Sequence, residues 1–201
     1  MKKYTITRQN HPVCWDQVDI LPIDLVQFGE SAPIKAQAQI CYDDTALYIR
    51  QTAVEEHIRA EETDPLGAPC EDSCLEFFFS PIWGDSRYFN IEYNPNGCIY
   101  LGLGDKVDGK VCLYRLINDN VLFDPIINRT EDGWSVEYSI PFTFIRHFFP
   151  EFDPVSGYQM RANCYKCGDK TVKRHYFAWN PLDPGLKTFH SPECFGTMIF
   201  E

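Results

Sequence analysis

The segment Tyr158-Gln-Met-Arg-Ala-Asn-Cys-Tyr165 decides the fold class of this chain. Its side chains alternate in character, as they do in a β-strand whose successive residues point to opposite faces. One face holds Tyr158, Met160, Ala162 and Cys164, and the other holds Gln159, Arg161, Asn163 and Tyr165. Buried polar groups cost free energy unless a polar partner lies against them. The pattern therefore predicts a strand with one face toward a core and one face available to a ligand.

Short strand-like runs of this kind recur along the chain, and turn-forming residues separate them. The predicted strands are 35–42, 46–54, 73–80, 88–93, 98–101, 111–116, 126–129, 134–140, 158–164, 175–178 and 196–200. Many short strands at this spacing are typical of two-sheet proteins. We predict an all-β fold, a single antiparallel β-sandwich of immunoglobulin-like or jelly-roll-like architecture, with at most short helical turns such as 142–149. Residues 1–201 are expected to form one domain, with 1–34 as an N-terminal extension packed on it.

The same alternation predicts which side chains fill the space between the two sheets, because the residues of one face recur every second position. The predicted core residues are Phe77, Phe79, Phe89, Ile91, Val136, Tyr138, Met160 and Phe195.

The composition excludes some classes of partner. Of the 201 residues, 44% are hydrophobic and 23% are charged, which is an ordinary globular balance. The formal net charge of −11 repels phosphate backbones and anionic lipids, so neither nucleic acid nor a membrane is an expected partner. The Met1-Lys-Lys start is not followed by the apolar run of a signal peptide. We expect a cytoplasmic protein, or a secreted one if the chain is a trimmed form.

The nine cysteines are scattered and odd in number, and a chain of this length can build a full core without disulfides. We expect nine free thiols in a reducing compartment. The Cys164-x-x-Cys167 pair suggests zinc, but Cys164 falls on the apolar face of its strand. The Cys70-x-x-x-Cys74 pair lacks the spacing of a zinc knuckle. No metal is therefore predicted at these cysteines.

Three of the predicted strands carry polar residues on one face. If the strands are neighbours, one sheet displays together Glu76, Asn90, Glu92, Arg161 and Asn163. These groups can donate to and accept from sugar hydroxyls, and the planar guanidinium of Arg161 can hold two oxygens. The alternative interpretation is a solvated face with surface ion pairs.

Six segments also match, in order, the motifs of a known family. They are Tyr42-Asp-Asp44, Glu71-Asp-Ser-Cys-Leu-Glu-Phe-Phe78, Gly133-Trp-Ser-Val-Glu-Tyr-Ser-Ile-Pro-Phe142, Arg161-Ala-Asn-Cys-Tyr-Lys-Cys-Gly-Asp169, His175-Tyr-Phe-Ala-Trp179 and Phe189-His-Ser-Pro-Glu-Cys-Phe-Gly196. The ordered set resembles the carbohydrate-binding family 9 modules. The resemblance implies a β-sandwich that binds an oligosaccharide end or a small sugar without catalysis and is linked to carbohydrate catabolism.

The resemblance also implies site residues. Two tryptophans sandwich the terminal sugar in sugar-binding members, and their positions fall on Cys70 and Phe189. Phe189 can still stack on a sugar, whereas Cys70 cannot, so Trp83, Trp179, Tyr165 or Tyr88 is expected to compensate. The family's polar contacts fall on Glu76, Asn90 and Arg161. The predicted site is Glu76, Asn90, Glu92, Arg161, Asn163, Tyr165, Trp179, Phe189 and His190.

Arg161 is the residue on which the predicted site depends most. An unpaired guanidinium in mid-strand is costly where it is covered, so Arg161 is expected to pair with Glu76 or Glu92 in the free protein. Its removal is expected to weaken sugar binding. Family 9 modules can bind structural calcium, and the loops at Asp43-Asp44, Asp105 and Asp108 offer oxygen ligands. No other cofactor is expected.

Two alternatives to a binding module remain open. A glycoside hydrolase-associated enzyme or accessory subunit would need a carboxyl pair, and Glu76 and Glu92 share a face. No feature of the sequence is seen to raise the pKa of either carboxyl, and no Gly-x-Ser-x-Gly or His-Glu-x-x-His motif occurs, so no catalytic residue is predicted. The second alternative is a degenerate sandwich that acts as a protein-interaction scaffold. The sequence does not determine the sugar or the oligomeric state.

Overall fold

The computed structural model describes residues 1–29 and 31–201, and most of these residues lie in or between β-strands. The described part has one α-helix, α1 (Phe142–Phe148), and three short 3₁₀ turns, η1 (Trp15–Gln17), η2 (Pro69–Glu71) and η3 (Pro192–Cys194). The strands are β1 (Lys3–Arg8), β2 (Leu21–Pro22), β3 (Leu25–Gly29), β4 (Lys35–Tyr42), β5 (Ala46–Val54), β6 (Cys74–Ser80), β7 (Arg87–Tyr93), β8 (Ile99–Val107), β9 (Lys110–Arg115), β10 (Ile126–Arg129), β11 (Gly133–Pro141), β12 (Gln159–Gly168), β13 (His175–Ala178) and β14 (Gly196–Phe200). The predicted mostly-β class is confirmed.

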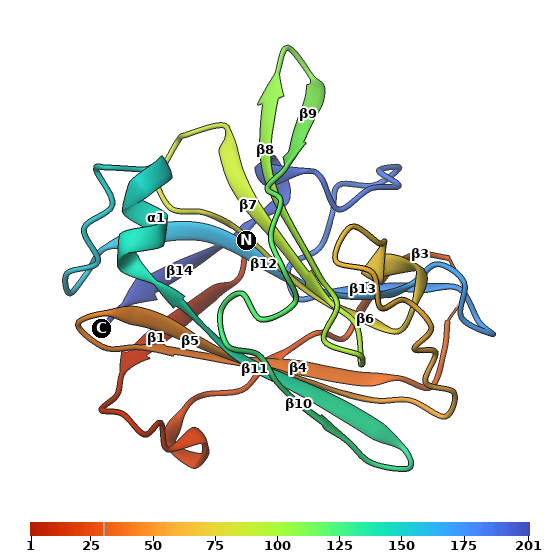
Figure 1. Cartoon of the computed structure of the whole chain (residues 1–201). Helices are drawn as coiled ribbons and strands as arrows, with labels where there is room; N and C mark the ends of the chain where they lie inside the picture. Colours follow the sequence, from red (N-terminus) through yellow and green to blue (C-terminus); the bar gives the residue numbers. More distant parts are fainter. Residues whose placement is uncertain (30) are drawn as a thin grey trace.

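The strands form one continuous hydrogen-bonded path in the order β10-β11-β5-β4-β1-β14-β12-β6-β7-β8-β9 (Figure 1). Strand β13 adds to β12 and β3, and β2 adds to β4. Strand β1 runs parallel to both β14 and β4 and joins the two halves of the path, whereas the other pairs are antiparallel. The sequence predicted wholly antiparallel pairing. The difference arises in the segment predicted as an extension, because that segment supplies β1.

The main core is shared by the two halves of the path. It contains seven of the eight predicted core residues, namely Phe77, Phe79, Phe89, Ile91, Val136, Tyr138 and Met160. Helix α1 covers one part of this core through Phe144 and Phe148, whose rings lie 5.3 and 5.4 Å from the ring of Phe89. The period-two pattern therefore identified the core strands correctly.

Phe195 is the exception, and its predicted place in the main core is wrong. It lies in a second apolar cluster on the opposite face of β6 and β12, where its ring meets Tyr88 edge-on at 5.6 Å. The reason is the alternation of β14 itself. Met198 and Phe200 point into the main core, so an odd-numbered residue of the same extended segment points away from it.

A fully buried lysine ties several elements together inside the molecule. The Nζ atom of Lys166 lies 3.2 Å from Oε2 of Glu55, which follows β5, and 2.9 Å from Nε2 of His175 on β13. The Glu55 carboxylate also accepts hydrogen bonds from Nε1 of Trp134 at 2.9 Å and from Oγ of Ser73 at 3.0 Å. Buried ions need such partners because their desolvation is costly.

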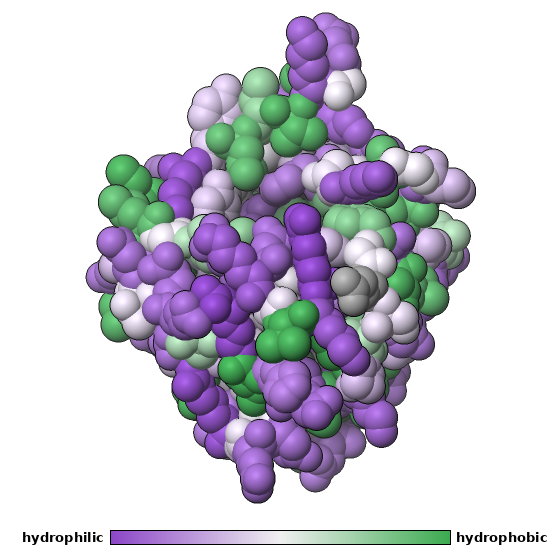
Figure 2. All heavy atoms as spheres, turned by 90° about the vertical axis from the view of Figure 1, so that its right-hand side faces the viewer, coloured by the Kyte–Doolittle hydropathy of each residue, from purple (hydrophilic) through white to green (hydrophobic). Residues whose placement is uncertain are grey.

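The surface on the side of β3 and β13 is mostly hydrophilic, with hydrophobic side chains scattered among polar ones (Figure 2). This agrees with the acidic composition. Among the described residues, no helix is long and apolar enough to cross a membrane.

Substitution of Lys166 by methionine tests the buried ion pair. The change keeps most of the apolar volume but leaves the Glu55 carboxylate buried without a cation, so unfolding in urea should show a loss of about 3–5 kcal/mol. The double variant with Glu55→Gln should regain part of that loss, because no uncompensated charge remains. A loss below about 1 kcal/mol in the single variant would mean that the pair is dispensable.

The pH dependence of stability tests the third partner of this network. Burial and the charge of Lys166 lower the pKa of His175 to about 4, from about 6.5 in an unfolded chain. Between these values the unfolded chain binds more protons, so the contribution of His175 is complete above pH ~6.5 and is lost as the pH falls toward ~4. Comparison of the parent with His175→Gln should show a shallower acid loss in the variant, by on the order of 2–3 kcal/mol. Equal slopes in the two proteins would contradict a buried neutral imidazole.

Candidate functional site

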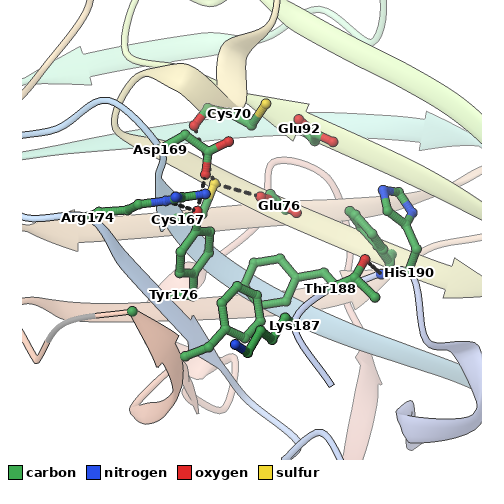
Figure 3. A pocket seen from close by; sticks show the side chains of 14 residues that line it. Cys70, Glu76, Glu92, Cys167, Asp169, Arg174, Tyr176, Lys187, Thr188 and His190 are labelled. Carbon is green, nitrogen blue, oxygen red and sulfur yellow. Dashed lines mark hydrogen bonds between the residues drawn. The ribbon is translucent and has the colours of Figure 1, made fainter. Parts of the chain in front are cut away.

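A cavity of about 450 Å³ opens on the face of β6, β7 and β12 that points away from the main core (Figure 3). The segment 187–190 covers one side of it, and β3, η2 and the turn between β12 and β13 supply the other walls. Its lining comprises Phe28, Gly29, Cys70, Glu76, Phe78, Glu92, Cys167, Asp169, Arg174, Tyr176, Lys187, Thr188, Phe189 and His190. The polar face predicted from β6, β7 and β12 is therefore largely covered rather than open to solvent.

Two carboxyl groups form the polar floor of the cavity. Glu76 on β6 and Glu92 on β7 are directly opposite each other in the antiparallel register. Nδ2 of Asn90 donates to Oε1 of Glu92 at 3.0 Å, and the Cys167 thiol donates to Oε1 of Glu76 at 2.8 Å. Alternation along β6, β7 and β12 places these groups on one face, because each strand contributes every second residue.

Burial changes the protonation of both carboxyls. It raises the pKa of Glu92 to about 7, and burial together with the charge of Glu92 raises the pKa of Glu76 well above its usual range. A protonated carboxyl donates a hydrogen bond and an ionised one only accepts. Near neutral pH the pair can therefore offer a donor and acceptors side by side, which suits a hydroxyl-rich ligand.

An aromatic wall faces this floor. The Phe189 ring stacks on the Tyr165 ring at 4.0 Å with an angle of 10° between the planes. It also packs against Phe28 at 5.5 Å and Tyr176 at 5.9 Å. The Tyr165 hydroxyl donates to the backbone oxygen of Phe189 at 3.3 Å. Phe189 is thus held in one orientation before any ligand arrives.

The rim of the cavity is polar and is fixed by hydrogen bonds. Arg174 donates to the Tyr176 hydroxyl, and that hydroxyl donates to Asp169 (Figure 3). Gly29 permits the close approach of Tyr176, because a Cβ there would lie 2.9 Å from Cδ2 of the ring and the backbone has a φ of +81°. Strand β3 therefore contributes both the Phe28 ring and a glycine that leaves room for Tyr176.

His190 supplies a further polar group beside the aromatic wall. Its Nδ1 lies 2.9 Å from the hydroxyl of the buried Tyr88. Burial lowers the pKa of His190 to about 4 and raises that of Tyr88, so the pair is neutral near pH 7. With the tyrosine hydroxyl donating to Nδ1, the ring hydrogen resides on Nε2 and is free to donate.

The structure brings together six of the nine predicted site residues. Glu76, Glu92, Phe189 and His190 line the cavity, while Asn90 and Tyr165 hold Glu92 and Phe189 in place. Cys70 also lines it. The two positions that the family resemblance equated with sandwiching tryptophans therefore face the same cavity.

Arg161, Asn163 and Trp179 lie outside the cavity. The predicted pairing of Arg161 with Glu76 or Glu92 is wrong, because its guanidinium donates to the backbone oxygens of Glu193 and Phe195. The Asn163 amide is bonded to the backbone of Asn180, at 2.9 Å in both directions. Trp179 is buried in the main core. Arg161 holds the segment before β14 directly, and Asn163 does so through Asn180, whose side chain donates to the backbone oxygen of Cys194.

The residues expected to replace the missing tryptophan do not stand in the cavity. Trp83 is exposed, and its ring lies 5.9 Å from the guanidinium carbon of Arg161. The buried Tyr88 does not line the cavity, and its hydroxyl is hydrogen-bonded to Nδ1 of His190. The residues that sequence reasoning missed are chiefly Phe28, Cys167, Asp169, Arg174 and Tyr176. Cys167, Asp169 and Tyr176 stand within the family-like motifs, so those three had a signal in the sequence, whereas Phe28 and Arg174 did not.

The carboxylates of Asp43, Asp44 and Asp105, named from the sequence as possible calcium ligands, form hydrogen bonds or ion pairs with neighbouring residues. Asp43 accepts hydrogen bonds from the backbone of Thr45 and Ala46 and from the Thr45 and Tyr48 hydroxyls. Asp44 pairs with Arg8, and Asp105 accepts from Ser86. Asp43 therefore shapes the turn between β4 and β5.

Comparison with known proteins identifies the family of the chain. The model of carbohydrate-binding family 9 matches residues 8–200 of the chain. The chain belongs to carbohydrate-binding family 9. No curated protein sequence matched it.

Solved structures show the same fold as this family 9 chain. A candidate carbohydrate-binding protein from Bacteroides uniformis is similar over 100% of this chain and 99% of its own, with a TM-score of 0.80 and 24% identity. A family 9 module from Caldicellulosiruptor kristjanssonii, solved with glucose, has a TM-score of 0.70 and 14% identity over 100% of this chain and 96% of its own. The same kind of module solved with cellotriose has a TM-score of 0.69 and 14% identity over 100% and 94%.

Replacement of Arg161 by alanine separates its structural contacts from the cavity. The variant loses the two hydrogen bonds to the segment before β14, so its free energy of unfolding should fall by about 1–2 kcal/mol. Its affinity for any ligand of the cavity should stay within about twofold of the parent, because the guanidinium lies outside the cavity. Loss of binding without loss of stability would restore Arg161 to the site.

Proposed function

We propose that this chain is a non-catalytic carbohydrate-binding domain that holds the end of an oligosaccharide or a small sugar in the cavity. The observation that carries the proposal is the meeting of Cys70, Phe189, Glu76 and Glu92 in one cavity of about 450 Å³. That volume falls within the range of small-molecule sites. Membership of family 9 supports the same ligand class.

The arrangement of the walls suits a neutral sugar. A pyranose presents apolar C–H faces and a rim of hydroxyls, which match the aromatic wall at Phe189 and the carboxyl floor at Glu76 and Glu92. The two Caldicellulosiruptor modules were solved with glucose and cellotriose, so glucose and β-glucan ends are the first ligands to test. With Cys70 in place of a second stacking ring, affinity depends more on hydrogen bonds here than in a two-tryptophan site.

Two finer points belong to the same proposal. We infer a sandwich-like arrangement from the core shared by the two halves of the strand path. A role in carbohydrate catabolism in the cytoplasm fits the free thiols of all nine cysteines.

Glycoside hydrolysis is the second candidate, and one observation favours it. From the sequence, neither carboxyl was expected to have a raised pKa. That expectation is wrong, because burial raises the pKa of both Glu76 and Glu92. Glu76 and Glu92 are directly opposed on neighbouring strands, and a raised pKa is what a general acid needs. Product formation from oligosaccharides therefore has to be measured together with binding.

Calorimetric titration of the whole chain with glucose, cello-oligosaccharides and a wider panel tests the proposal. The parent should bind at least one sugar, and Glu92→Ala should weaken that binding by about 1.5–3 kcal/mol through loss of hydrogen bonds. Phe189→Leu should weaken it by about 1 kcal/mol through loss of stacking. Arg161→Ala is the matched control and should bind like the parent.

Each other outcome has a distinct meaning. Sugar release detected during the titration would replace the binding module by a hydrolase. No heat with any sugar, from a protein shown to be folded, would favour the interaction scaffold. Equal affinity in Glu92→Ala and the parent would place the sugar elsewhere.

A further inference from the structure

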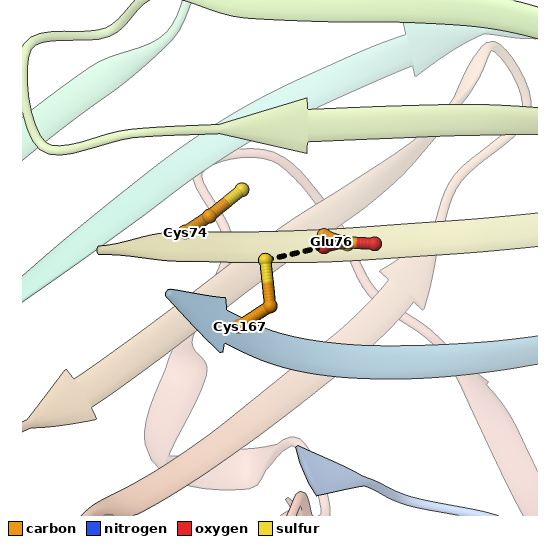
Figure 4. A group of neighbouring side chains, drawn as sticks. All are labelled: Cys74, Glu76 and Cys167. Carbon is orange, nitrogen blue, oxygen red and sulfur yellow. Dashed lines mark hydrogen bonds between the residues drawn. The ribbon is translucent and has the colours of Figure 1, made fainter. Parts of the chain in front are cut away.

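Three side chains with metal-ligating atoms meet at the floor of the cavity (Figure 4). They are Cys74 and Glu76 of β6 and Cys167 of β12, and their ligand atoms all lie within 4.8 Å of one another. The strand register produces this meeting. Cys74 and Cys167 are directly opposite each other, and Glu76 follows Cys74 by two residues and so shares its face.

We propose that Cys74, Cys167 and Glu76 bind a thiophilic divalent cation, with zinc as the first choice. Zinc bonds of ~2.3 Å to sulfur and ~2.0–2.2 Å to oxygen place the ligand atoms of a tetrahedral site about 3.3–3.8 Å apart. The sulfur of Cys167 lies 2.8 Å from Oε1 of Glu76, so the three groups need only small movements to surround an ion. Two thiolates and a carboxylate are a donor set that suits zinc.

The fourth coordination position faces the cavity. Cys167 and Glu76 both line the cavity, while Cys74 is buried beneath it. Three protein ligands and one accessible position are the arrangement in which zinc takes a water molecule or a ligand oxygen. The proposed ion would therefore be reachable from the space that we assign to the sugar, although its binding does not require a sugar.

The surroundings favour a cation at this point. Glu92 and Asp169 also line the cavity, so the proposed ligands stand among other acidic groups. Of the basic groups nearby, Lys166 points to the opposite side and pairs with Glu55, and Arg174 is engaged by the Tyr176 hydroxyl at the rim. Lys187 lines the cavity from the segment 187–190 (Figure 3). On binding, Cys74, Cys167 and the protonated Glu76 release their protons to solvent. The two thiolates and the carboxylate then carry three negative charges, so a divalent cation leaves the site with a net charge of −1.

No spacing motif could show this site in the sequence. The Cys164-x-x-Cys167 pair divides between the two faces of β12, and Cys164 lies in the main core. The partner of Cys167 is instead a cysteine 93 positions earlier, brought opposite by strand pairing. Because strand pairing brings the two sulfur ligands together, they need not be close in the sequence, as they are in a Cys-x-x-Cys motif.

Cobalt is a suitable probe because thiolate–cobalt bonds absorb in the near ultraviolet and tetrahedral cobalt gives intense visible bands. The reduced, chelator-treated whole chain should bind one equivalent of Co²⁺ with both signatures in the absence of sugar, and Zn²⁺ should displace it. Cys74→Ser and Cys167→Ser should weaken binding at least about tenfold, the cost that even outer partners of a metal site impose when they are removed. Cys112→Ser, at an exposed thiol, is the matched control and should bind like the parent.

A measurement on the parent protein is also needed, because substitution of the buried Cys74 or Cys167 can disturb folding. Bound Zn²⁺ should raise the midpoint of thermal unfolding. In partly denaturing urea, where buried thiols become transiently exposed, it should also slow alkylation of Cys74 and Cys167 relative to the metal-free protein, read by mass spectrometry, while Cys112 stays reactive. Absence of the thiolate–cobalt band, or protection of other cysteines instead, would overturn the inference. A Cys74–Cys167 disulfide in protein whose reduced form binds no cobalt would also overturn it. Sugar titrations in the presence of chelator keep this result separate from the proposed sugar site.

Discussion

The buried contact between Lys166 and Glu55 decides which face of β12 becomes the site. A fully buried ammonium group is tolerated only beside an opposite charge, and Glu55 is held in place by Trp134 and Ser73. Lys166 must therefore point inward, toward β5. Because successive residues of a strand point to opposite faces, Tyr165 and Cys167 must then point outward. A shift of β12 by one residue would bury Tyr165 against Glu55 and remove both outward residues from the cavity.

The outward face of β6 and β12 is covered because it carries large aromatic rings, whose exposure to water is unfavourable. Along β6 and β12, the large rings of Phe78 and Tyr165 need cover, and the segment 182–195 supplies it through Phe189 and Phe195. Arg161 and Asn163 secure that segment by bonding to its backbone and to Asn180. The same face then divides into an apolar part that is closed and an acidic part, at Glu76 and Glu92, that lines the cavity.

Local alternation in the sequence was enough to predict strands β4 to β14, seven of the eight core residues and the carboxyl pair at Glu76 and Glu92, but not β1, β2 and β3 in the segment taken as an extension. It could not predict the partners of Arg161. Alternation shows which face of a strand a residue is on, but it does not show which distant segment packs on that face, and here the segment before β14 does. It also missed Phe28 and Gly29, which reach the cavity through the pairing of β3 with β13. Such contacts join segments about 150 residues apart. The parallel insertion of β1 between β14 and β4 is long-range in the same way.

The floor of the cavity also links the two proposals energetically. A cation on Cys74, Cys167 and Glu76 would hold the Glu76 carboxylate ionised and turn one of its oxygens away from the cavity. The sugar would then meet a metal-bound position and Glu92 in place of two carboxyls. Each ligand would alter the affinity for the other by the same factor, since coupling between two binding sites is reciprocal. The sign of that coupling follows from the occupant of the fourth position: a sugar oxygen bound to the ion gives cooperation, and a retained water molecule that fills the same space gives competition.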